Sequence, residues 1–188
     1  MLKKIVAIGP ESTGKSTLCE QLATHYDTLW CPEYAREYLL THGTNYDYDD
    51  LLTIAKGQLN LEDEYTGRIN VPGSGLPNHD SRLSTPRPLL FIDTDMYVMK
   101  VWSEFVFNKC HRFILDQVIE RKYDLYLLCN TDLPWVKDEL REYPDLESRR
   151  KLYHIYKDIM INQSVPWIDI SGNPEERMAL SIKAVNSL

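Results

Sequence analysis

A length of 188 residues suits one domain built around a single sizeable core. The net charge is −7 and no stretch of the chain forms a basic stripe, which argues against nucleic acid as a partner. No apolar run approaches the roughly 20 residues that span a bilayer, so we expect no contact with a membrane. Four scattered cysteines without metal-ligand spacing favour free thiols in a cytoplasmic protein, whose oligomeric state the sequence leaves open.

The predicted elements alternate between apolar runs and helical periods along the whole chain. The apolar runs predict strands at 5–8, 29–31, 89–92, 125–129 and 167–170. Helical periods fill the intervals, from Lys15 onward, at 34–42, at 49–65 and after each later strand. This order is typical of an α/β protein with a doubly wound, parallel five-stranded sheet flanked by helices.

The stretch from 66 to 88 differs in composition from the rest of the chain. It holds four of the ten prolines and three of the eight glycines, so neither the strand period nor the helix period can persist there. We therefore predict a flexible inserted loop within one domain that covers 1–188, and not a boundary between two domains.

Residues 9–16, called the P-loop below, have the sequence GPESTGKS and match the phosphate-binding motif GxxxxGK[ST] in full. Glycines allow successive backbone N–H groups to point at phosphate oxygens, and the following helix adds its positive end. A chance glycine loop would lack the flanking strand and helix, so we favour a P-loop NTPase that binds ATP. Lys15 is expected to reach the β- and γ-phosphates. The expected ATP-binding residues here are Gly9, Glu11, Ser12, Thr13, Gly14, Lys15, Ser16 and Thr17.

Two aspartates follow the third predicted strand. Asp93 comes directly after 89–92, where the second acidic motif of P-loop proteins holds Mg²⁺, so Ser16 and Asp93 are the predicted metal site. Asp95 lies two residues on and is a candidate to bind the substrate from the same side. The alternative is that one of the two aspartates only caps the helix that begins near Met96.

Glu33 ends the second predicted strand, at the edge of the sheet where ligands of doubly wound proteins gather. Its carboxylate could orient or deprotonate an attacking hydroxyl group of the substrate, so Glu33 is a candidate for catalysis together with Lys15 and Asp93. Arg36, one helical turn along, could bind the substrate or neutralise phosphate charge. The alternative is an exposed ion pair between Glu33 and Arg36.

The polar segment 130–150, called the lid below, follows the fourth predicted strand and carries several cations. Phosphoryl transfer requires charge on the γ-phosphoryl group to be neutralised, and a mobile segment with arginines would supply this and exclude water. Arg141 is our candidate for catalysis and Arg149 for ATP binding. Either arginine could instead be a solvated surface charge.

Twelve tyrosines and four tryptophans suit a site that stacks a planar ring. Tyr38 and Trp135 lie in segments that could border such a site, and they are candidates to bind the substrate. Trp102 lies on the apolar stripe of a predicted helix, so we expect it in the core.

Five motifs occur in one order along the chain: GPESTGKS at 9–16, PEYAREY at 32–38, IAKGQ at 54–58, FIDTD at 91–95 and DLPWV-x-D-x-LR at 132–141. Together they resemble the ribosylnicotinamide kinase domain of NadR-type proteins, over nearly the whole chain outside the inserted loop. The resemblance implies a thymidylate-kinase-like fold and transfer of the γ-phosphate of ATP to the 5′-hydroxyl of nicotinamide riboside, which gives nicotinamide mononucleotide. It also implies that Glu33, Arg36 and Gln58 lie toward the nucleoside.

Larger members of that family carry an adenylyltransferase domain and some a helix-turn-helix domain. This sequence begins at the P-loop strand, so we expect neither NAD synthesis nor operator binding. The substrate side is less constrained than the ATP side, because ring stacking tolerates many bases. A kinase for another nucleoside or a nucleoside monophosphate is therefore one alternative, and an ATP-dependent regulatory binding module is another.

Overall fold

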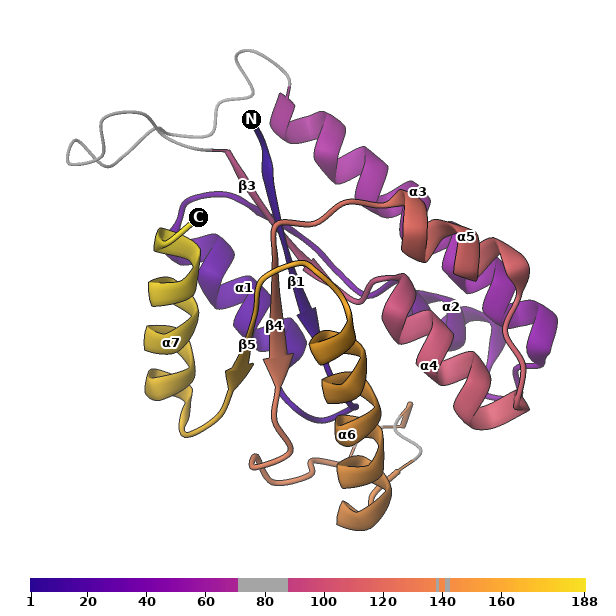
Figure 1. Cartoon of the computed structure of the whole chain (residues 1–188). Helices are drawn as coiled ribbons and strands as arrows, with labels where there is room; N and C mark the ends of the chain where they lie inside the picture. The colour runs from indigo at the N-terminus through magenta and orange to yellow at the C-terminus, as the bar shows by residue number, and fades with distance from the viewer. Residues whose placement is uncertain (71–87, 138, 141–142) are drawn as a thin grey trace.

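A computed structural model of the chain describes residues 1–70, 88–137, 139–140 and 143–188. Five strands form one sheet in the order β2-β3-β1-β4-β5, and every neighbouring pair is parallel (Figure 1). The strands are β1 (Lys3–Ile8), β2 (Leu29–Cys31), β3 (Leu89–Asp93), β4 (Leu125–Cys129) and β5 (Trp167–Ile170). The predicted doubly wound, parallel five-stranded sheet is confirmed.

Helices connect the strands and cover both faces of the sheet. They are α1 (Lys15–His25), α2 (Tyr34–His42), α3 (Tyr48–Asn70), α4 (Met96–Phe107), α5 (Arg112–Glu120), α6 (Leu146–Asn162) and α7 (Pro174–Asn186). Several begin at side-chain caps, most completely α7, where Asn173 and Glu176 form a reciprocal capping box. Within the described residues, none of these helices has the length and apolarity needed to cross a membrane.

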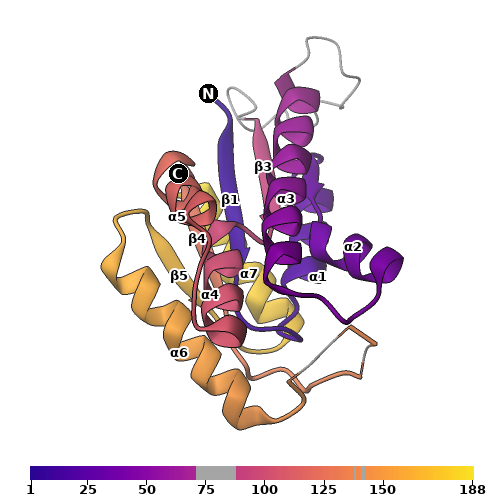
Figure 2. The same ribbon diagram turned by 90° about the vertical axis from the view of Figure 1, so that its right-hand side faces the viewer.

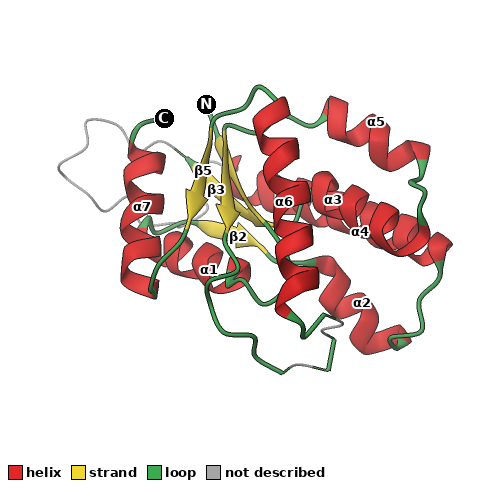
Figure 3. Cartoon of the chain, turned by 60° about the horizontal axis from the view of Figure 1, so that its bottom comes forward, coloured by secondary structure: helices red, strands yellow, loops and turns green. Residues whose placement is uncertain are grey.

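The sheet separates two apolar layers, because successive side chains of a strand point to opposite faces. In β1, Ile5 and Ala7 belong to the layer beneath α1 and α7, whereas Val6 and Ile8 belong to the layer beneath α4 and α6. Figures 1 and 3 show α1 and α7 on one side of the sheet and α3 to α6 on the other. Both faces of the sheet are therefore buried.

A third apolar cluster joins α2, α3, α4 and α5 beyond the edge of the sheet. Its fully buried members include Leu51, Ile54, Met99 and Ile114. Figure 2 shows α2 beside α3, in agreement with the contacts between them. This helical layer fixes the segment that links β2 to α2, which carries Glu33.

The carboxyl ends of β2, β3 and β1 lie next to one another at one edge of the sheet. Ala7 of β1 pairs with Asp93 of β3, so the end of β3 reaches the start of the P-loop. Glu33 follows β2 on the far side of Asp93. Strand pairing thus gathers the P-loop, Asp93 and Glu33 at the edge where ligands of doubly wound proteins bind.

Helix α3 is longer than predicted and includes residues 66–70, which we expected in the inserted loop. The cause is that Leu61, Tyr65 and Ile69 continue the apolar stripe at intervals of four and pack against the α4–α6 layer. Gly67 is tolerated within a helix that is held in this way. The remainder of the predicted loop, 71–87, lies outside the described residues, and Pro88 leads into β3 by accepting a hydrogen bond from the Lys3 amide.

Candidate active site

The P-loop runs from the end of β1 to the start of α1, as its motif predicts. Gly9 has a φ of 142°, and a β-carbon there would lie 2.7 Å from the carbonyl oxygen of Cys129. Only glycine permits this close approach of the loop to β4. The hydroxyl of Thr13 donates to the carbonyl of Pro10 over 2.7 Å, which closes the loop upon itself. The ammonium of Lys15 donates to the same carbonyl over 2.9 Å and lies on the inside of the loop.

Asp93 is fully buried at the end of β3 and faces the start of α1. The hydroxyl of Ser16 donates to Oδ2 of Asp93 over 2.5 Å. Burial raises the pKa of the Asp93 carboxyl above its ordinary value, and the ammonium of Lys15 and the hydroxyl of Ser16 oppose that rise.

The Asp93 and Ser16 pair fits a magnesium ion. Oδ1 of Asp93 is buried and accepts no hydrogen bond from any described residue, so one carboxylate oxygen is left for a cation. Mg²⁺ prefers hard oxygen ligands and uses one or two carboxylates together with the phosphates of its substrate. A hydroxyl and a buried carboxylate at the mouth of a phosphate-binding loop meet that preference.

Glu33 caps the start of α2, yet its side chain makes no hydrogen bond to the helix. Its Oε1 instead accepts a hydrogen bond of 3.4 Å from the hydroxyl of Thr94, next to Asp93. Burial raises the pKa of the Glu33 carboxyl, and the nearby carboxylate of Asp93 raises it further. A carboxyl group with a raised pKa beside a phosphate-binding loop is suited to accept a proton.

One cavity of about 480 Å³ connects these groups. Its polar wall consists of the P-loop with Thr17, together with Glu33, Arg36 and Asp93. Its aromatic and apolar wall is lined by Trp30, Pro32, Ala35, Leu39, Val98, Trp102, Phe105, Leu140, Tyr143, Leu152 and Tyr156. The size is in the range of sites for small organic ligands, and the mixed wall suits a molecule with a charged end and a planar end.

Trp102 packs against the third apolar cluster, as the sequence analysis expected of a core residue, but it is not confined to the core. It is half-buried, lines the cavity and donates from its indole N–H to the hydroxyl of Tyr46 over 2.8 Å. Tyr46 also meets the indole ring edge-on, with ring centroids 5.0 Å apart. The apolar stripe of α4 is therefore shared between the core and the cavity.

Four predicted substrate-binding side chains do not line the cavity, namely Tyr38, Gln58, Asp95 and, in the lid, Trp135. The hydroxyl of Tyr38 donates to Asp50 over 2.6 Å, and Gln58 is buried beneath the segment that carries Glu33. Asp95 accepts hydrogen bonds from the amides of Tyr97 and Val98 and so caps α4, which was the alternative interpretation. Its other oxygen accepts from the hydroxyl of Tyr126 over 2.9 Å, deep in the core.

The described part of the lid lies against the P-loop. The amide of Val136 donates to the hydroxyl of Ser12 over 3.1 Å, and the amide of Tyr143 donates to the carboxylate of Glu11 over 2.6 Å. Two side chains of the P-loop thus hold backbone groups of the lid. The described part of the segment is therefore in direct contact with the phosphate-binding loop.

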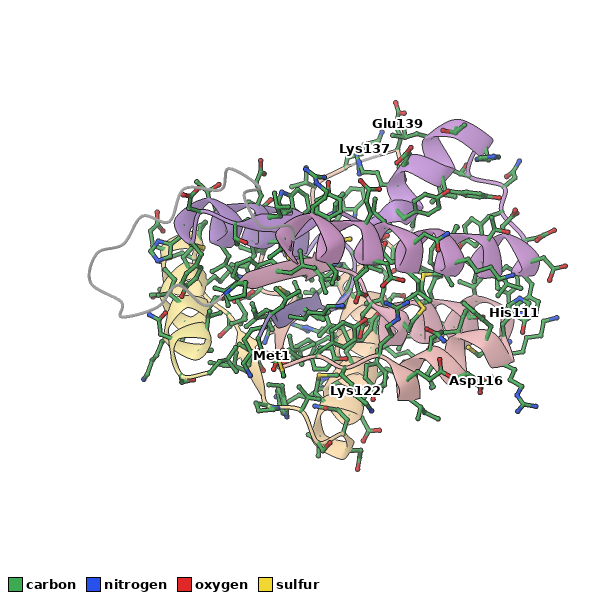
Figure 4. The ribbon with its side chains drawn as sticks, turned by 90° about the horizontal axis from the view of Figure 1, so that it is seen from above. Met1, His111, Asp116, Lys122, Lys137 and Glu139 are labelled. Carbon is green, nitrogen blue, oxygen red and sulfur yellow. The ribbon has the colours of Figure 1, made fainter. Side chains whose placement is uncertain are left out.

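The other lid predictions have different outcomes. Trp135 is half-buried but is not among the residues that line the cavity. Arg149 is 2% exposed and donates to the carbonyl oxygens of Ser12 and Leu133, so it joins the P-loop to the lid. Arg141 lies outside the described residues. Lys137 is exposed, and Figure 4 shows it at the edge of the molecule.

Arg177 of α7 was missed by the sequence analysis, although it holds three loops together. Its guanidinium is 4% exposed and donates to the carbonyl oxygens of Thr13 (2.9 Å) and Gly172 (3.0 Å). It also donates to the carbonyl of Asn130 (3.0 Å) and to the carboxylate of Asp132. The available signal was the spacing of Arg177, which lies four residues before Ser181 and eight before Val185. This spacing places Arg177 on the buried face of α7.

The sheet order, the P-loop after β1 and the buried aspartate at the end of β3 define a P-loop nucleotide-binding fold of the kind found in nucleotide kinases. The chain belongs to the AAA domain family, whose profile matches residues 4–177. The resemblance to the ribosylnicotinamide kinase domain of NadR-type proteins is also confirmed by relatives in sequence and in structure.

Two curated relatives are the trifunctional NAD biosynthesis/regulator proteins NadR of Escherichia coli (strain K12) and Salmonella typhimurium (strain LT2). They are 23% identical to this chain over 169 and 176 residues, respectively. The matches cover 90% of this chain and 38% of each relative, so the chain spans less than half the length of these proteins.

Solved structures share the fold. A NadR protein in complex with NR superposes with a TM-score of 0.72 and 20% identity, over 98% of this chain and 49% of that one. Thymidylate kinase from Ehrlichia chaffeensis superposes with a TM-score of 0.66 and 14% identity, over 98% of both chains. The thymidylate-kinase-like fold is thereby confirmed.

Proposed function

We propose that the protein is an ATP-dependent kinase that transfers the γ-phosphoryl group to the 5′-hydroxyl of nicotinamide riboside and so forms nicotinamide mononucleotide. The observation that carries the proposal is one cavity lined by the P-loop, by Glu33 and by several aromatic side chains. The similar NadR proteins support it, because one was solved in complex with NR and one in complex with NAD and AMP-PNP.

The donor side of the proposed reaction is built from the P-loop. Backbone amides of the loop bind the phosphates of ATP, and Lys15 moves from the carbonyl of Pro10 to the β- and γ-phosphates. Ser16 and Asp93 would hold Mg²⁺, which when bound neutralises charge on the phosphates. The lid, anchored through Glu11 and Ser12, excludes water from the γ-phosphoryl group.

The acceptor side is built around Glu33. Its carboxylate accepts the hydrogen bond of the attacking hydroxyl group and takes up its proton as the new O–P bond forms. The bond between the γ-phosphorus and the bridging oxygen of ATP breaks in the same transfer, and ADP leaves. Arg36 also lines the cavity and binds the sugar or phosphate oxygens. The aromatic wall holds the planar base of the nucleoside by stacking or edge contacts.

The domain that performs this reaction extends over residues 1–188, with the lid at about 130–150. The fold shared with thymidylate kinase over 98% of both chains favours one alternative, a kinase for a different nucleoside or for a nucleoside monophosphate. In that case Arg36, which is exposed at the wall of the cavity, would bind the phosphate of the acceptor.

The test is a coupled ADP-release assay over a panel of nucleosides and nucleoside monophosphates, with mass spectrometry of the products. We expect nicotinamide riboside to give the highest kcat/KM and a product with the mass of nicotinamide mononucleotide. Lys15→Met should abolish the transfer, whereas Lys137→Met, which changes an exposed lysine of the lid, should leave most of it. Faster transfer to another acceptor would replace the proposed substrate. ADP release that does not depend on any acceptor would contradict a nucleoside kinase.

A further inference from the structure

Gln58 lies on α3, within a motif singled out in the sequence, but the cavity does not explain it. The side chain is 1% exposed and is not among the residues that line the cavity. A buried amide group must satisfy its hydrogen bonds within the protein, because an unsatisfied one is costly. The partners of Gln58 therefore indicate what the residue does.

Those partners lie on both sides of Glu33. Oε1 of Gln58 accepts a hydrogen bond of 2.7 Å from the amide of Tyr34, and Nε2 donates to the carbonyl of Pro32 over 3.3 Å. The amide orientation is determined by this pattern, since a backbone N–H requires the oxygen and a carbonyl requires the nitrogen. One side chain thus holds the peptide groups immediately before and after Glu33.

The same amide group also reaches β3. Nε2 of Gln58 lies 3.5 Å from the carbonyl oxygen of Asp93, at the limit of a hydrogen bond. The residue after Asp93, Thr94, donates from its hydroxyl to the carboxylate of Glu33. Gln58 therefore lies between the segment of Glu33 and the strand end that carries Asp93.

The neighbouring glycine gives a second and independent observation. A β-carbon on Gly57 would lie 2.1 Å from the ring of Tyr34, the first residue of α2. Any larger residue at 57 would push α2 away from α3 and take the amide of Tyr34 out of reach of Gln58. The pair Gly57–Gln58 thus combines a close approach of the two helices with the hydrogen bonds that the approach permits.

We infer that Gln58 is a positioning residue that fixes the backbone of Glu33 relative to Asp93 and so aims the Glu33 carboxylate at the acceptor hydroxyl group. The inference rests on the proposed function, in which Glu33 receives the proton. Glu33 needs such a support because its own side chain makes no capping bond to α2. A misplacement of a reacting group by about 1 Å can cost roughly 100-fold in rate, so a backbone support can act on catalysis without touching the substrate.

The experiment is a double-mutant cycle between Gln58→Leu and Glu33→Gln, read as kcat for the nucleoside and as the Kd for AMP-PNP. We expect Gln58→Leu to lower kcat roughly 10- to 100-fold and to change the Kd less than about 2-fold, because the P-loop is untouched. In the Glu33→Gln background the same substitution should cost less than about 3-fold, since no base is left to aim. Gln58→Glu, which keeps the acceptor for Tyr34, should lie between the wild type and Gln58→Leu.

Leu59→Ala is the matched control, because it removes a buried side chain of α3 next to Gln58 and outside the site. It should lower the thermal stability and leave kcat unchanged at a temperature where the variant is folded. A folded Gln58→Leu with wild-type kcat would overturn the inference, as would an undiminished loss in the Glu33→Gln background. A wild-type enzyme that phosphorylates no acceptor would instead refute the proposed function, and the role of Gln58 with it.

Discussion

The hydroxyl of Ser16 donates a 2.5 Å hydrogen bond to the carboxylate of Asp93, although the two residues are 77 positions apart in the chain. One comes from the start of α1 and the other from the end of β3. Their contact places the last residue of the P-loop beside a buried acid with one oxygen that no described residue engages.

Asp93→Asn should weaken the magnesium-dependent part of nucleotide binding. The amide keeps the shape of the carboxylate and loses its charge, so we expect a roughly 10- to 100-fold loss of affinity for AMP-PNP with Mg²⁺. Affinity in the presence of EDTA should change little. Isothermal titration calorimetry under both conditions measures the difference. Asp124→Asn is the control, because this carboxylate pairs with Lys3 and does not line the cavity. Equal losses with and without the ion would contradict the assignment of Asp93.

Glu33→Gln should separate catalysis from binding. Loss of a general base typically costs at least roughly 100-fold, and we expect that loss in the rate of phosphoryl transfer. The Kd for AMP-PNP should stay within about 2-fold, because the carboxylate of Glu33 is expected to act on the acceptor. Single-turnover assays with rapid quenching measure the chemical step. Glu37→Gln, an exposed change on the same helix, should behave as wild type. Near-normal transfer by Glu33→Gln would exclude the residue as the base.

Arg177→Met should affect both stability and nucleotide binding. The substitution leaves three carbonyl groups and the partly exposed carboxylate of Asp132 without their donor, and each buried group that stays unsatisfied costs about 1–3 kcal/mol. The P-loop also loses its contact through the Thr13 carbonyl, so the Kd for AMP-PNP should rise. Urea unfolding and calorimetry on the folded variant report the two effects separately. Arg121→Met, whose partners Asp63 and Glu62 lie away from the P-loop, should leave the Kd unchanged. An unchanged Kd in Arg177→Met would restrict its role to stability.

Asp132→Asn should change how stability depends on pH. Burial tends to raise the pKa of the Asp132 carboxyl, but the amide of Gly172 and the guanidinium of Arg177 outweigh it and hold the pKa below the ordinary 3.8. Because the folded-state pKa is the lower one, the ionised group stabilises the fold above the unfolded-state value, and this contribution is lost as the pH falls through the folded-state pKa. We expect the variant to be less stable than the wild type at neutral pH, with a gap that closes in acid.

Urea unfolding at about pH 7 and about pH 3 measures that gap. Asp116→Asn, an exposed carboxylate on α5 that Figure 4 labels, should change stability little at either pH. A gap of equal size at both pH values would mean that Asp132 contributes through its shape or its hydrogen bonds and not through its charge.

The parts of the site that could be predicted are those whose functional groups lie close together in the sequence or directly after a predicted strand. The P-loop carries its glycine pattern, its lysine and its hydroxyl within eight consecutive residues. It lies between a strand predicted by an apolar run and a helix predicted by its period. Asp93 and Glu33 follow apolar runs, and the topology of parallel sheets places the ends of such runs at one edge. These inferences depend on neighbours in the chain and on one general rule of topology.

The parts that were missed depend on which partner a side chain meets. Asp95 and Asp93 have the same chemistry and almost the same position, yet Asp95 turns back to cap α4 and only the folded backbone determines this. Arg177 was overlooked because its partners are carbonyl groups, two of them on loops far away in the chain, and no sequence motif identifies such partners. The place of Trp102 at the cavity was also missed, because an apolar stripe has the same sequence pattern whether it faces the core or a cavity.

The pairing of Ala7 with Asp93 ties the metal-binding geometry to strand alignment. Side chains alternate along a strand, so a slip of one position would bring Ile92 or Thr94 opposite Ala7 and turn the carboxylate away from Ser16. The two strands are separated in the chain by α1, β2, α2 and α3, and pairings of such long range are slow to form. After denaturation, Mg²⁺-dependent affinity for AMP-PNP should therefore return only when β1 and β3 regain their native alignment. Hydrophobic collapse by itself should not restore it.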